Sequence, residues 1–411
     1  MRIWTFASPL LHLALLSALS ACSSVPVPGD AEGEPGVGAY FAEEAVAEAD
    51  PSGDDPFETA TGPGDDGAAL TDLATPAPSV TLFLNRHGGA FRRGPSSSST
   101  NRSSLVPGES AELKPYGGSD DGWREVVDCI GEQFAPFNVA ITEEEPREGE
   151  YIEVVVGDRP TSLGLPSKVV GIAPMDTRGC RVIKKAVVFV FAEQVGERRS
   201  RRVCEVAAQE VGHALGLDHE FLCEDPMSYL KGCRAPKVFQ NVDARCGEHS
   251  SRDCMCGGET QNSMQVLAKK LGLKDGSMLP PPQVDEAPPE IAFVETDARS
   301  STGGEEVVVA AQVDDDVSVS QVELVWEEDG KEVAAPCSKA SPGATCRRDG
   351  DRFSWRLRNG DVSRSLRLRA EDAAGNVTVR ETAAPRRDSL AGAEPVRRPS
   401  KSGRSRTGSS A

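Results

Sequence analysis

The chain has few aromatic residues and a modest hydrophobic content. Aromatic residues make up 5% of its 411 positions and hydrophobic residues make up 38%. These values are low for a chain that is folded throughout, so we expect a hydrophobic core in part of the sequence and unstructured segments elsewhere. The length predicts about two or three domains, or fewer when such segments are long.

Basic residues are missing from a long N-terminal stretch. No Lys or Arg occurs between Arg2 and Arg86, while residues 30–78 are rich in Asp and Glu. The formal net charge is −19, which argues against nucleic acid as a partner because phosphate binding requires a basic surface. Since most of the excess charge lies in one segment, residues 23–78 are predicted to form a disordered acidic tether.

The apolar run at residues 10–19 is too short to span a bilayer as a permanent helix. It follows Arg2 and precedes small residues, a pattern typical of an export signal over residues 1–22. The end of the run, Leu19-Ser20-Ala21-Cys22, resembles the lipobox of bacterial lipoproteins, in which the cysteine is lipidated. This resemblance implies membrane attachment through Cys22 and, with Ser23 next, an outer-membrane location. An ordinary cleaved signal peptide with a chance cysteine is the alternative.

Cysteine usage is that of an exported protein. The chain has 11 cysteines, and assigning Cys22 to the lipid leaves an even number for disulfide bonds in an oxidising compartment. Cys337 and Cys346 lie close together near the C-terminus and are predicted to pair with each other. The sequence leaves the pairing of the others open; they are Cys129, Cys180, Cys204, Cys223, Cys233, Cys246, Cys254 and Cys256.

Hydrophobic periodicity predicts an α+β domain over residues 79–280. Short β-branched runs alternate with two long segments of helical spacing, and a further helical segment follows them. The expected architecture is a mixed twisted sheet with two long helices and a C-terminal helix. The predicted strands are 79–86, 138–142, 151–157, 168–174 and 186–195, and the predicted helices are 122–137, 201–217 and 261–273.

A different pattern follows the proline-rich linker at residues 281–290. Residues 291–385 contain short alternating strands separated by turn residues, which predicts an all-β sandwich. The segment RLRAEDAAGNVTV (367–379) resembles the last hairpin of bacterial immunoglobulin-like modules, for which a protein or cell-surface ligand is a hypothesis. Trp326 and Trp355 are predicted to be core residues rather than sugar-binding ones. Residues 386–411 are predicted to be a disordered basic tail.

The stretch QEVGHALGLDH (209–219) contains the candidate catalytic residues. Gln209 and His213 are four residues apart and therefore share one face of a helix. Gly216 can end that helix in a left-handed conformation, after which His219 can return toward the same point. Glu210 lies beside this ligand set and could take a proton from a water molecule. The pattern predicts a zinc site with Glu210 as general base.

With Asp225-Pro226-Met227-Ser228-Tyr229 following shortly after His219, the sequence resembles the metzincin zinc endopeptidases. The resemblance covers about residues 79–275. It implies that Met227 is the methionine of the turn beneath the metal and that Tyr229 reaches the metal or the oxyanion. It also implies a bound Zn²⁺ ion and a peptide or protein substrate.

Gln209 stands where the family has its first histidine ligand. An amide oxygen is a weak neutral donor for zinc, which prefers nitrogen and sulfur. Two main readings therefore stay open: a working or weakened zinc endopeptidase, and an inactive pseudo-protease that binds a partner as a surface or adhesion lipoprotein. A purely structural role of His213 and His219 is the third. A zinc knuckle of Cys246, His249, Cys254 and Cys256 is less favoured than disulfide bonds.

Overall fold

The computed structural model describes residues 37–43, 78–301, 304–328, 330–358, 365–382 and 386–387. These residues form two compact units. The first unit contains Val80–Cys129 and Val139–Gly216 together with one N-terminal strand, and the second contains Ile130–Asn138 and the described residues from Leu217 onward. The predicted signal peptide with Cys22, most of the acidic tether and most of the basic tail lie outside the described residues.

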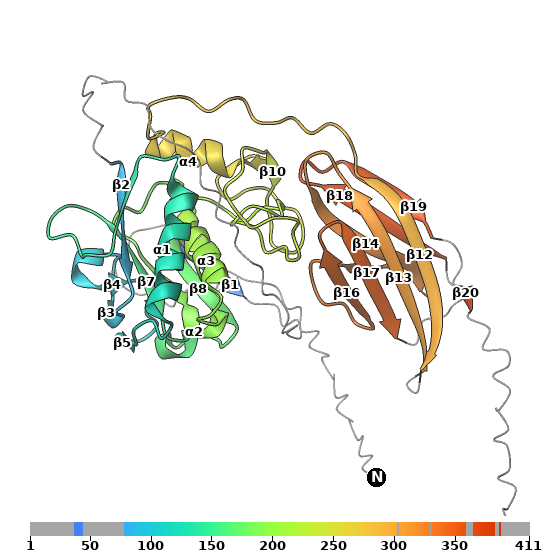
Figure 1. Ribbon diagram of the computed structural model, residues 1–411, viewed down its shortest axis with the longest axis horizontal. Coiled ribbons are helices and arrows are strands. Elements are labelled where there is room, and N and C mark those ends of the chain that lie inside the picture. Colours follow the sequence, from blue (N-terminus) through green and yellow to red (C-terminus); the bar gives the residue numbers. More distant parts are fainter. Residues whose placement is uncertain are drawn as a thin grey trace, which may run out of the picture. The chain divides into compact units, whose positions relative to one another are not determined.

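A six-stranded sheet forms the centre of the first unit (Figure 1), with the strand order β1-β8-β9-β7-β2-β6. Strands β6, β2, β7 and β9 are parallel, while β8 and β1 are antiparallel to their neighbours. β7 and β9 are buried along their whole length, as expected for continuous β-branched runs in the middle of a sheet. The strands are β1 (Val37–Glu43), β2 (Val80–Asn85), β6 (Val139–Thr142), β7 (Ile152–Gly157), β8 (Val169–Asp176) and β9 (Val187–Phe191).

Two long helices accompany this sheet. They are α1 (Asp120–Phe134) and α3 (Ser200–Ala214), and a disulfide bond between Cys129 and Cys204 joins them. α3 packs on β8 and β9. The short helix α2 (Ala192–Val195) continues directly from β9, so the predicted strand 186–195 ends earlier than its apolar run. The mixed α/β character of the prediction is therefore confirmed.

A small second sheet lies in the segment between β2 and α1, for which the sequence predicts no strand. β3 (Gly89–Arg93) pairs with β4 (Arg102–Ser103) and β5 (Ser110–Leu113), and the 3₁₀ turns η1 (Ser98–Thr100) and η2 (Pro160–Leu163) lie beside β4 and β5 respectively. Phe91 is fully buried with its ring edge-on to Phe189 of β9, at a centroid distance of 5.2 Å. Strands this short give too weak a periodic signal to be distinguished from a Ser- and Gly-rich loop.

The prediction of a tether that is disordered throughout residues 23–78 is wrong for Val37–Glu43. This segment forms β1, which pairs along β8 in antiparallel register from Val37–Asp176 to Ala42–Gly171. Its sequence, VGAYFAE, is a short group of β-forming residues within an acidic context. Its partner strand lies far away in sequence, which is why composition alone does not reveal the pairing.

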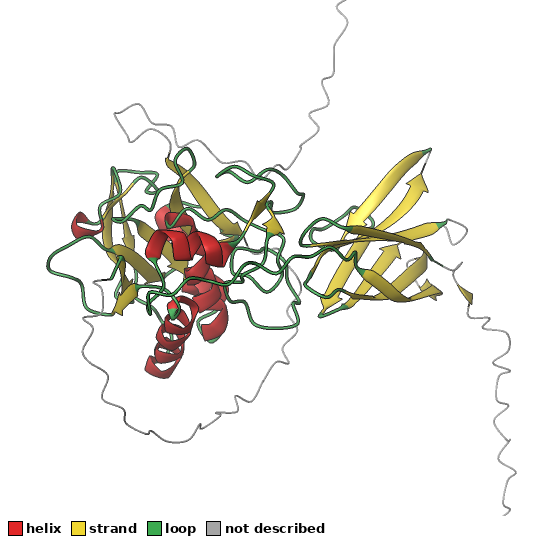
Figure 2. Cartoon of the chain, turned by 90° about the horizontal axis from the view of Figure 1, so that it is seen from above, coloured by secondary structure: helices red, strands yellow, loops and turns green. Residues whose placement is uncertain are grey.

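The second unit contains a Cys-rich segment, one helix and a β-sandwich. Asn262 caps the N-terminus of the helix α4 (Ser263–Leu271), and its side chain accepts a hydrogen bond from the backbone N–H of Gln265. A minimal hairpin of β10 (Ala244–Arg245) and β11 (Thr260–Gln261) precedes it. After α4, every regular element among the described residues is a strand (Figure 2), as the sequence predicts for residues 291–385.

The sandwich has two antiparallel sheets, one of which gains a short parallel strand. Trp355 and Trp326 are buried in the core between them, as predicted. Arg386–Arg387 forms the added strand β20, so the prediction of a tail that is disordered from residue 386 is wrong for these two residues. The other strands are β12 (Glu290–Ser301), β13 (Gly304–Asp314), β14 (Val319–Glu328), β15 (Lys331–Pro336), β16 (Ala344–Asp349), β17 (Arg352–Arg358), β18 (Leu366–Asp372) and β19 (Val377–Glu381).

Disulfide bonds connect cysteines throughout the described chain. The predicted pairing of Cys337 with Cys346 is confirmed. Cys223 pairs with Cys233 and Cys246 pairs with Cys254, while Cys180 and Cys256 are also disulfide-bonded. This usage indicates an exported, non-cytoplasmic protein. Within the described residues, no helix is both long enough and apolar enough to cross a membrane.

Candidate functional site

The last turns of α3 present three of the predicted site residues. Gln209, Glu210 and His213 are each no more than 2% exposed. The helix carries them inward because its whole second half, from Val206 to Ala214, is buried. Gln209 and His213 lie one turn apart on the same face. The amide nitrogen Nε2 of Gln209 is buried and has no hydrogen-bond partner within the described part of the chain.

Glu210 lies against the backbone of β8. A Cβ atom placed on Gly171 would come within 2.4 Å of its Oε1 atom, so the close approach requires glycine at this position. Both carboxylate oxygens are buried, and neither meets a hydrogen-bond donor among the described residues. Burial raises the pKa of Glu210 well above its ordinary value. An uncompensated buried carboxylate is costly, so this side chain is suited to meet a cation or a water molecule.

α3 ends as the sequence predicts. Leu215 is still in the right-handed helical conformation, while Gly216 has φ +83° and donates its N–H to the carbonyl oxygen of His213 at 2.8 Å. A left-handed residue at this position turns the chain out of the helix. His219 follows three residues later and belongs to the second unit.

His219 is held by a network of charged side chains. Its Nδ1 atom lies 3.0 Å from Oε1 of Glu248, and the ring is 2% exposed. Arg252 donates to Glu248 at 2.7 Å and to both carboxylate oxygens of Asp218 at 2.6 and 2.8 Å. Because Glu248 occupies Nδ1, the Nε2 atom of His219 is the nitrogen suited to a metal.

Arg252 partly offsets the charges of the two carboxylates in this network. Burial alone would raise the pKa of Glu248, but hydrogen bonds from His219 and Arg252 outweigh it and lower the pKa to about 2. Asp218, His219 and Glu248 each offer a ligand atom within 4.8 Å of the others. A cation among these three would lie close to the guanidinium of Arg252, so the group orients His219 rather than forming a metal site by itself.

Met227 lies in a tight turn next to this network. The Met227 side chain is fully buried, its N–H donates to Oδ1 of Asp225 at 2.8 Å, and its carbonyl accepts from the backbone of Glu220 at 3.2 Å. Asp225 also accepts hydrogen bonds from Gln240 and Ser263. Burial raises the pKa of Asp225 to about 6. Burial, together with the charge of Asp225, raises the pKa of Glu220 well above its ordinary range.

Tyr229 is half-buried, and its ring contacts that of His219 at a centroid distance of 4.4 Å. The second unit thus brings together two predicted site residues, His219 and Tyr229, and the first unit brings together Gln209, Glu210 and His213. Sequence reasoning missed Asp218, Glu248 and Arg252. The only local signal was an acidic residue directly before His219, because Glu248 and Arg252 lie in the Cys-rich segment, where no motif marks them.

Two other candidate zinc groups contain oxidised cysteines. Cys246, Cys254 and Cys256 of the zinc-knuckle alternative are all disulfide-bonded, as are Cys223 and Cys233 of a second group that includes Glu224. A sulfur in a disulfide bond is not a thiolate ligand. Neither group therefore competes with the histidines as a zinc site.

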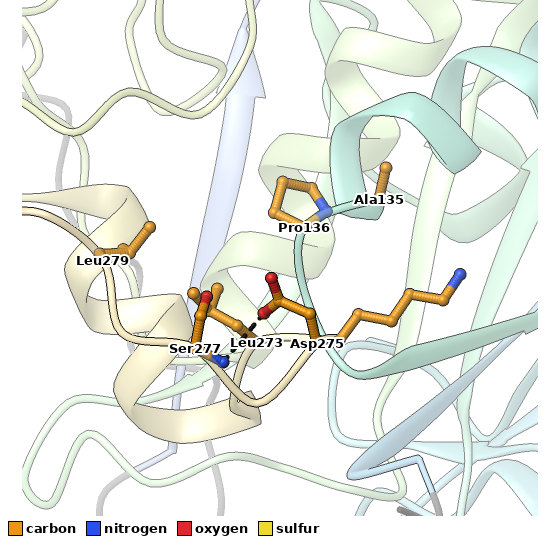
Figure 3. A pocket seen from close by; sticks show the side chains of 7 residues that line it. Ala135, Pro136, Leu273, Asp275, Ser277 and Leu279 are labelled. Atoms are coloured by element: carbon orange, nitrogen blue, oxygen red, sulfur yellow. Dashed lines mark hydrogen bonds between the residues drawn. The ribbon is translucent and has the colours of Figure 1, made fainter. Parts of the chain in front are cut away.

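A pocket of about 330 Å³ lies near the ends of α1 and α4 (Figure 3), and its lining includes Pro136, Leu273, Asp275 and Ser277. Its interior hydrogen bond joins the backbone N–H of Ser277 to Asp275 at 2.9 Å. It contains no residue of the predicted site and no cluster of catalytic side chains. The pocket therefore adds nothing to the candidate site.

Comparisons with known proteins do not show which family the chain belongs to. No protein family profile matches the chain, and neither does any curated protein. Among solved structures, OgpA from Akkermansia muciniphila is 12% identical, with 77% of this chain and 94% of that chain covered and a TM-score of 0.19. The twitchin kinase region from C. elegans is 13% identical at a TM-score of 0.18; 29% of this chain is covered, and the match spans about a fifth (19%) of that structure.

Proposed function

We propose that this chain is an exported, lipid-anchored zinc endopeptidase with a metzincin-like domain at residues 79–280. In this proposal Gln209, His213 and His219 would bind the zinc ion. Glu210 would act as the general base in the hydrolysis of peptide bonds. Met227 belongs to the turn that supports the site. The lipid on Cys22 anchors the protein to the membrane, with an outer-membrane location.

One observation carries the proposal more than any other: the fully buried carboxylate of Glu210 has no hydrogen-bond partner among the described residues. A structural glutamate at this depth would be expected to have a donor or a countercharge. Glu210 instead lies next to Gln209 and three residues before His213. This arrangement matches the requirements of a base beside a metal.

The donor set fits zinc. The two imidazoles are nitrogen ligands of the kind that zinc prefers, and the hydrogen bond of His219 to Glu248 is the outer contact that fixes such a ligand. Gly216 is followed by His219 after three residues, so roughly 10 Å of chain at most separates them. When bound, zinc would supply the Lewis acidity that polarises a peptide carbonyl and activates water.

The protein's own residues provide the remaining steps. Glu210 accepts the proton of the attacking water and passes it to the leaving amine, which a buried carboxylate of raised pKa can do at neutral pH. Tyr229 offers a phenolic hydroxyl that can donate to the developing oxyanion. Gln209 contributes a neutral amide oxygen, so we expect weaker zinc binding than a third imidazole would give.

A second candidate function is peptide binding without hydrolysis. The strand β1 already lies along β8 in antiparallel register, with Ala42 opposite Gly171 and hence beside Glu210. The outer edge of β8 thus accepts an extended chain, which is the geometry of recognition by strand addition. In this alternative the chain is a surface binding or adhesion lipoprotein, and the β-sandwich contributes a ligand site.

Peptide hydrolysis by the variant Glu210→Gln separates the two functions. The amide cannot accept the proton, so hydrolysis by the zinc-loaded chain should fall about 10²- to 10⁴-fold, while zinc content and thermal stability stay near those of the parent. Glu259→Gln, the same change at an exposed position, is the control and should leave the rate unchanged. The second candidate is supported instead if the parent shows no hydrolysis and Glu210→Gln binds peptide as well as the parent does.

A further inference from the structure

Four aspartates lie together at one end of the β-sandwich. Asp285 precedes β12, Asp315 and Asp316 form the turn between β13 and β14, and Asp372 ends β18. One carboxylate oxygen from each of Asp285, Asp315 and Asp316 lies within 4.8 Å of the others. Asp372 is the strongest charged neighbour of Asp285. We refer to these residues as the four-aspartate cluster.

Backbone amides donate hydrogen bonds to one carboxylate oxygen of Asp315 and to one of Asp372. Oδ1 of Asp315 accepts from Val317 and Ser318 at 3.0 and 2.8 Å, and Oδ1 of Asp372 accepts from Gly375 and Asn376 at 2.7 and 2.8 Å. These bonds fix the orientation of both side chains. They leave the second oxygen of each available for another partner.

Those second oxygens are buried and have no partner within the described residues. This is true of Oδ2 of Asp315 and Oδ2 of Asp372, while the carboxylate of Asp285 has only the backbone N–H of Ala287 nearby. Asp372 is only 1% exposed, so solvent does not compensate for its missing hydrogen bond. The native fold therefore holds the carboxyl groups of three aspartates together with few donors, an arrangement that is costly in the ionised state unless a cation joins them.

No basic side chain neutralises the four-aspartate cluster. Among the described residues, none of its members forms an ion pair with Lys, Arg or His. Burial and then the charges of Asp372, Asp315 and Asp316 raise the pKa of Asp285 to about 7. The electrostatic repulsion that these neighbours exert is thus not offset by any ion pair among the described residues.

We propose that the four-aspartate cluster is a binding site for a single Ca²⁺ ion. Calcium takes several oxygen ligands in flexible geometry, and carboxylates from separate turns supply them. Zinc is disfavoured because the site offers no nitrogen or sulfur. The backbone carbonyl of Asp285 already accepts a hydrogen bond from Asn376 at 3.3 Å, so the ion would fasten the end of the linker to the sandwich.

Calcium titration of the full chain, after chelator treatment, tests this proposal. The parent should bind about one Ca²⁺ with a dissociation constant on the order of 10⁻⁴ to 10⁻³ M or tighter. Asp372→Asn should weaken binding at least about 10-fold, and Asp285→Asn with Asp315→Asn should abolish it. Glu332→Gln, which removes an exposed carboxylate of the same sandwich, should have no effect. Magnesium in place of calcium should bind more weakly because it demands stricter geometry.

Thermal unfolding gives a second readout, because the melting temperature of Asp285→Asn relative to the parent should change sign when calcium is added. Without calcium, Asp285→Asn should melt at a higher temperature than the parent, because one repelling charge is removed. With calcium, the parent should gain stability and the variant should not. A folded parent that shows neither binding nor a thermal shift up to about 10 mM Ca²⁺ overturns the proposal, as does equal calcium affinity in parent and Asp372→Asn. Glu210→Gln should keep full calcium binding, so failure of the zinc proposal remains distinguishable.

Discussion

The two parts of the candidate site differ in how their charges are satisfied. In the first unit, Glu210 is buried against Gly171 without any hydrogen-bond partner among the described residues. In the second unit, Glu248 and Asp218 share Arg252, and Glu248 holds His219. A satisfied network orients a side chain, whereas an unsatisfied carboxylate has free lone pairs for chemistry. Under the proposed function, Glu210 acts as the general base and Glu248 orients His219.

A carboxylate outside the site sharpens this comparison, because burial alone does not imply catalysis. Glu153 of β7 accepts from Asn85 at 2.8 Å, but its Oε2 has no partner within the described residues. Burial raises its pKa to about 7 from 4.5. The folded protein therefore holds a proton that the unfolded chain releases, and the resulting stabilisation, complete below about pH 4.5, is lost as the pH rises through about 7.

Glu153→Gln should remove this loss. At pH 8 the variant should be more stable than the parent by up to about 3 kcal/mol, and near pH 4 the two should be alike. Denaturant unfolding at several pH values measures the difference, and peptide hydrolysis should not change. Equal pH profiles for the parent and the variant would show that folding does not raise the pKa of Glu153.

Gly171→Ala tests the close approach of Glu210 to β8. The added Cβ would overlap the carboxylate, so we expect a loss of about 1–3 kcal/mol in stability together with a displaced base and lower activity. Gly131→Ala in α1 is the matched control, since a Cβ there meets no atom within 4 Å; it should raise stability by up to about 1 kcal/mol. Similar results for both variants would contradict the packing of Glu210 against β8.

Glu248→Gln tests the second region. Loss of the carboxylate frees the Nδ1 atom of His219 from its charged partner, and zinc affinity should fall about 10- to 100-fold. Competition with a chromophoric chelator measures the change. Unaltered affinity would mean that the carboxylate of Glu248 does not position His219 for the metal.

The smallest expected effect concerns β1. Either Ala39 or Tyr40 points its N–H toward β8 in an antiparallel pair, so substituting both by proline removes that donor. Binding or hydrolysis of an added peptide should rise roughly 3- to 10-fold as the edge of β8 is released. Prolines at Ala31 and Glu32, which precede the strand, are the control. No increase would mean that peptides do not use this edge.

Local patterns in the sequence predicted the long helices and the central strands. The apolar run at Val187–Phe191, the helix that carries Glu210 and the left-handed Gly216 all follow from periodicity or backbone preference. Contacts between distant segments were not predictable. β1 needs the edge of β8, and His219 needs Glu248 from the Cys-rich loop. Neither partner has a periodic or motif signal of its own, and both depend on tertiary packing.

Zinc content of the purified full chain tests the central claim most directly. The account predicts about one zinc per chain in the parent, tighter binding after Gln209→His because imidazole is the better ligand, and loss of zinc after His213→Ala. A parent that folds normally yet takes up no zinc at saturating concentrations, with Gln209→His equally metal-free, would contradict it.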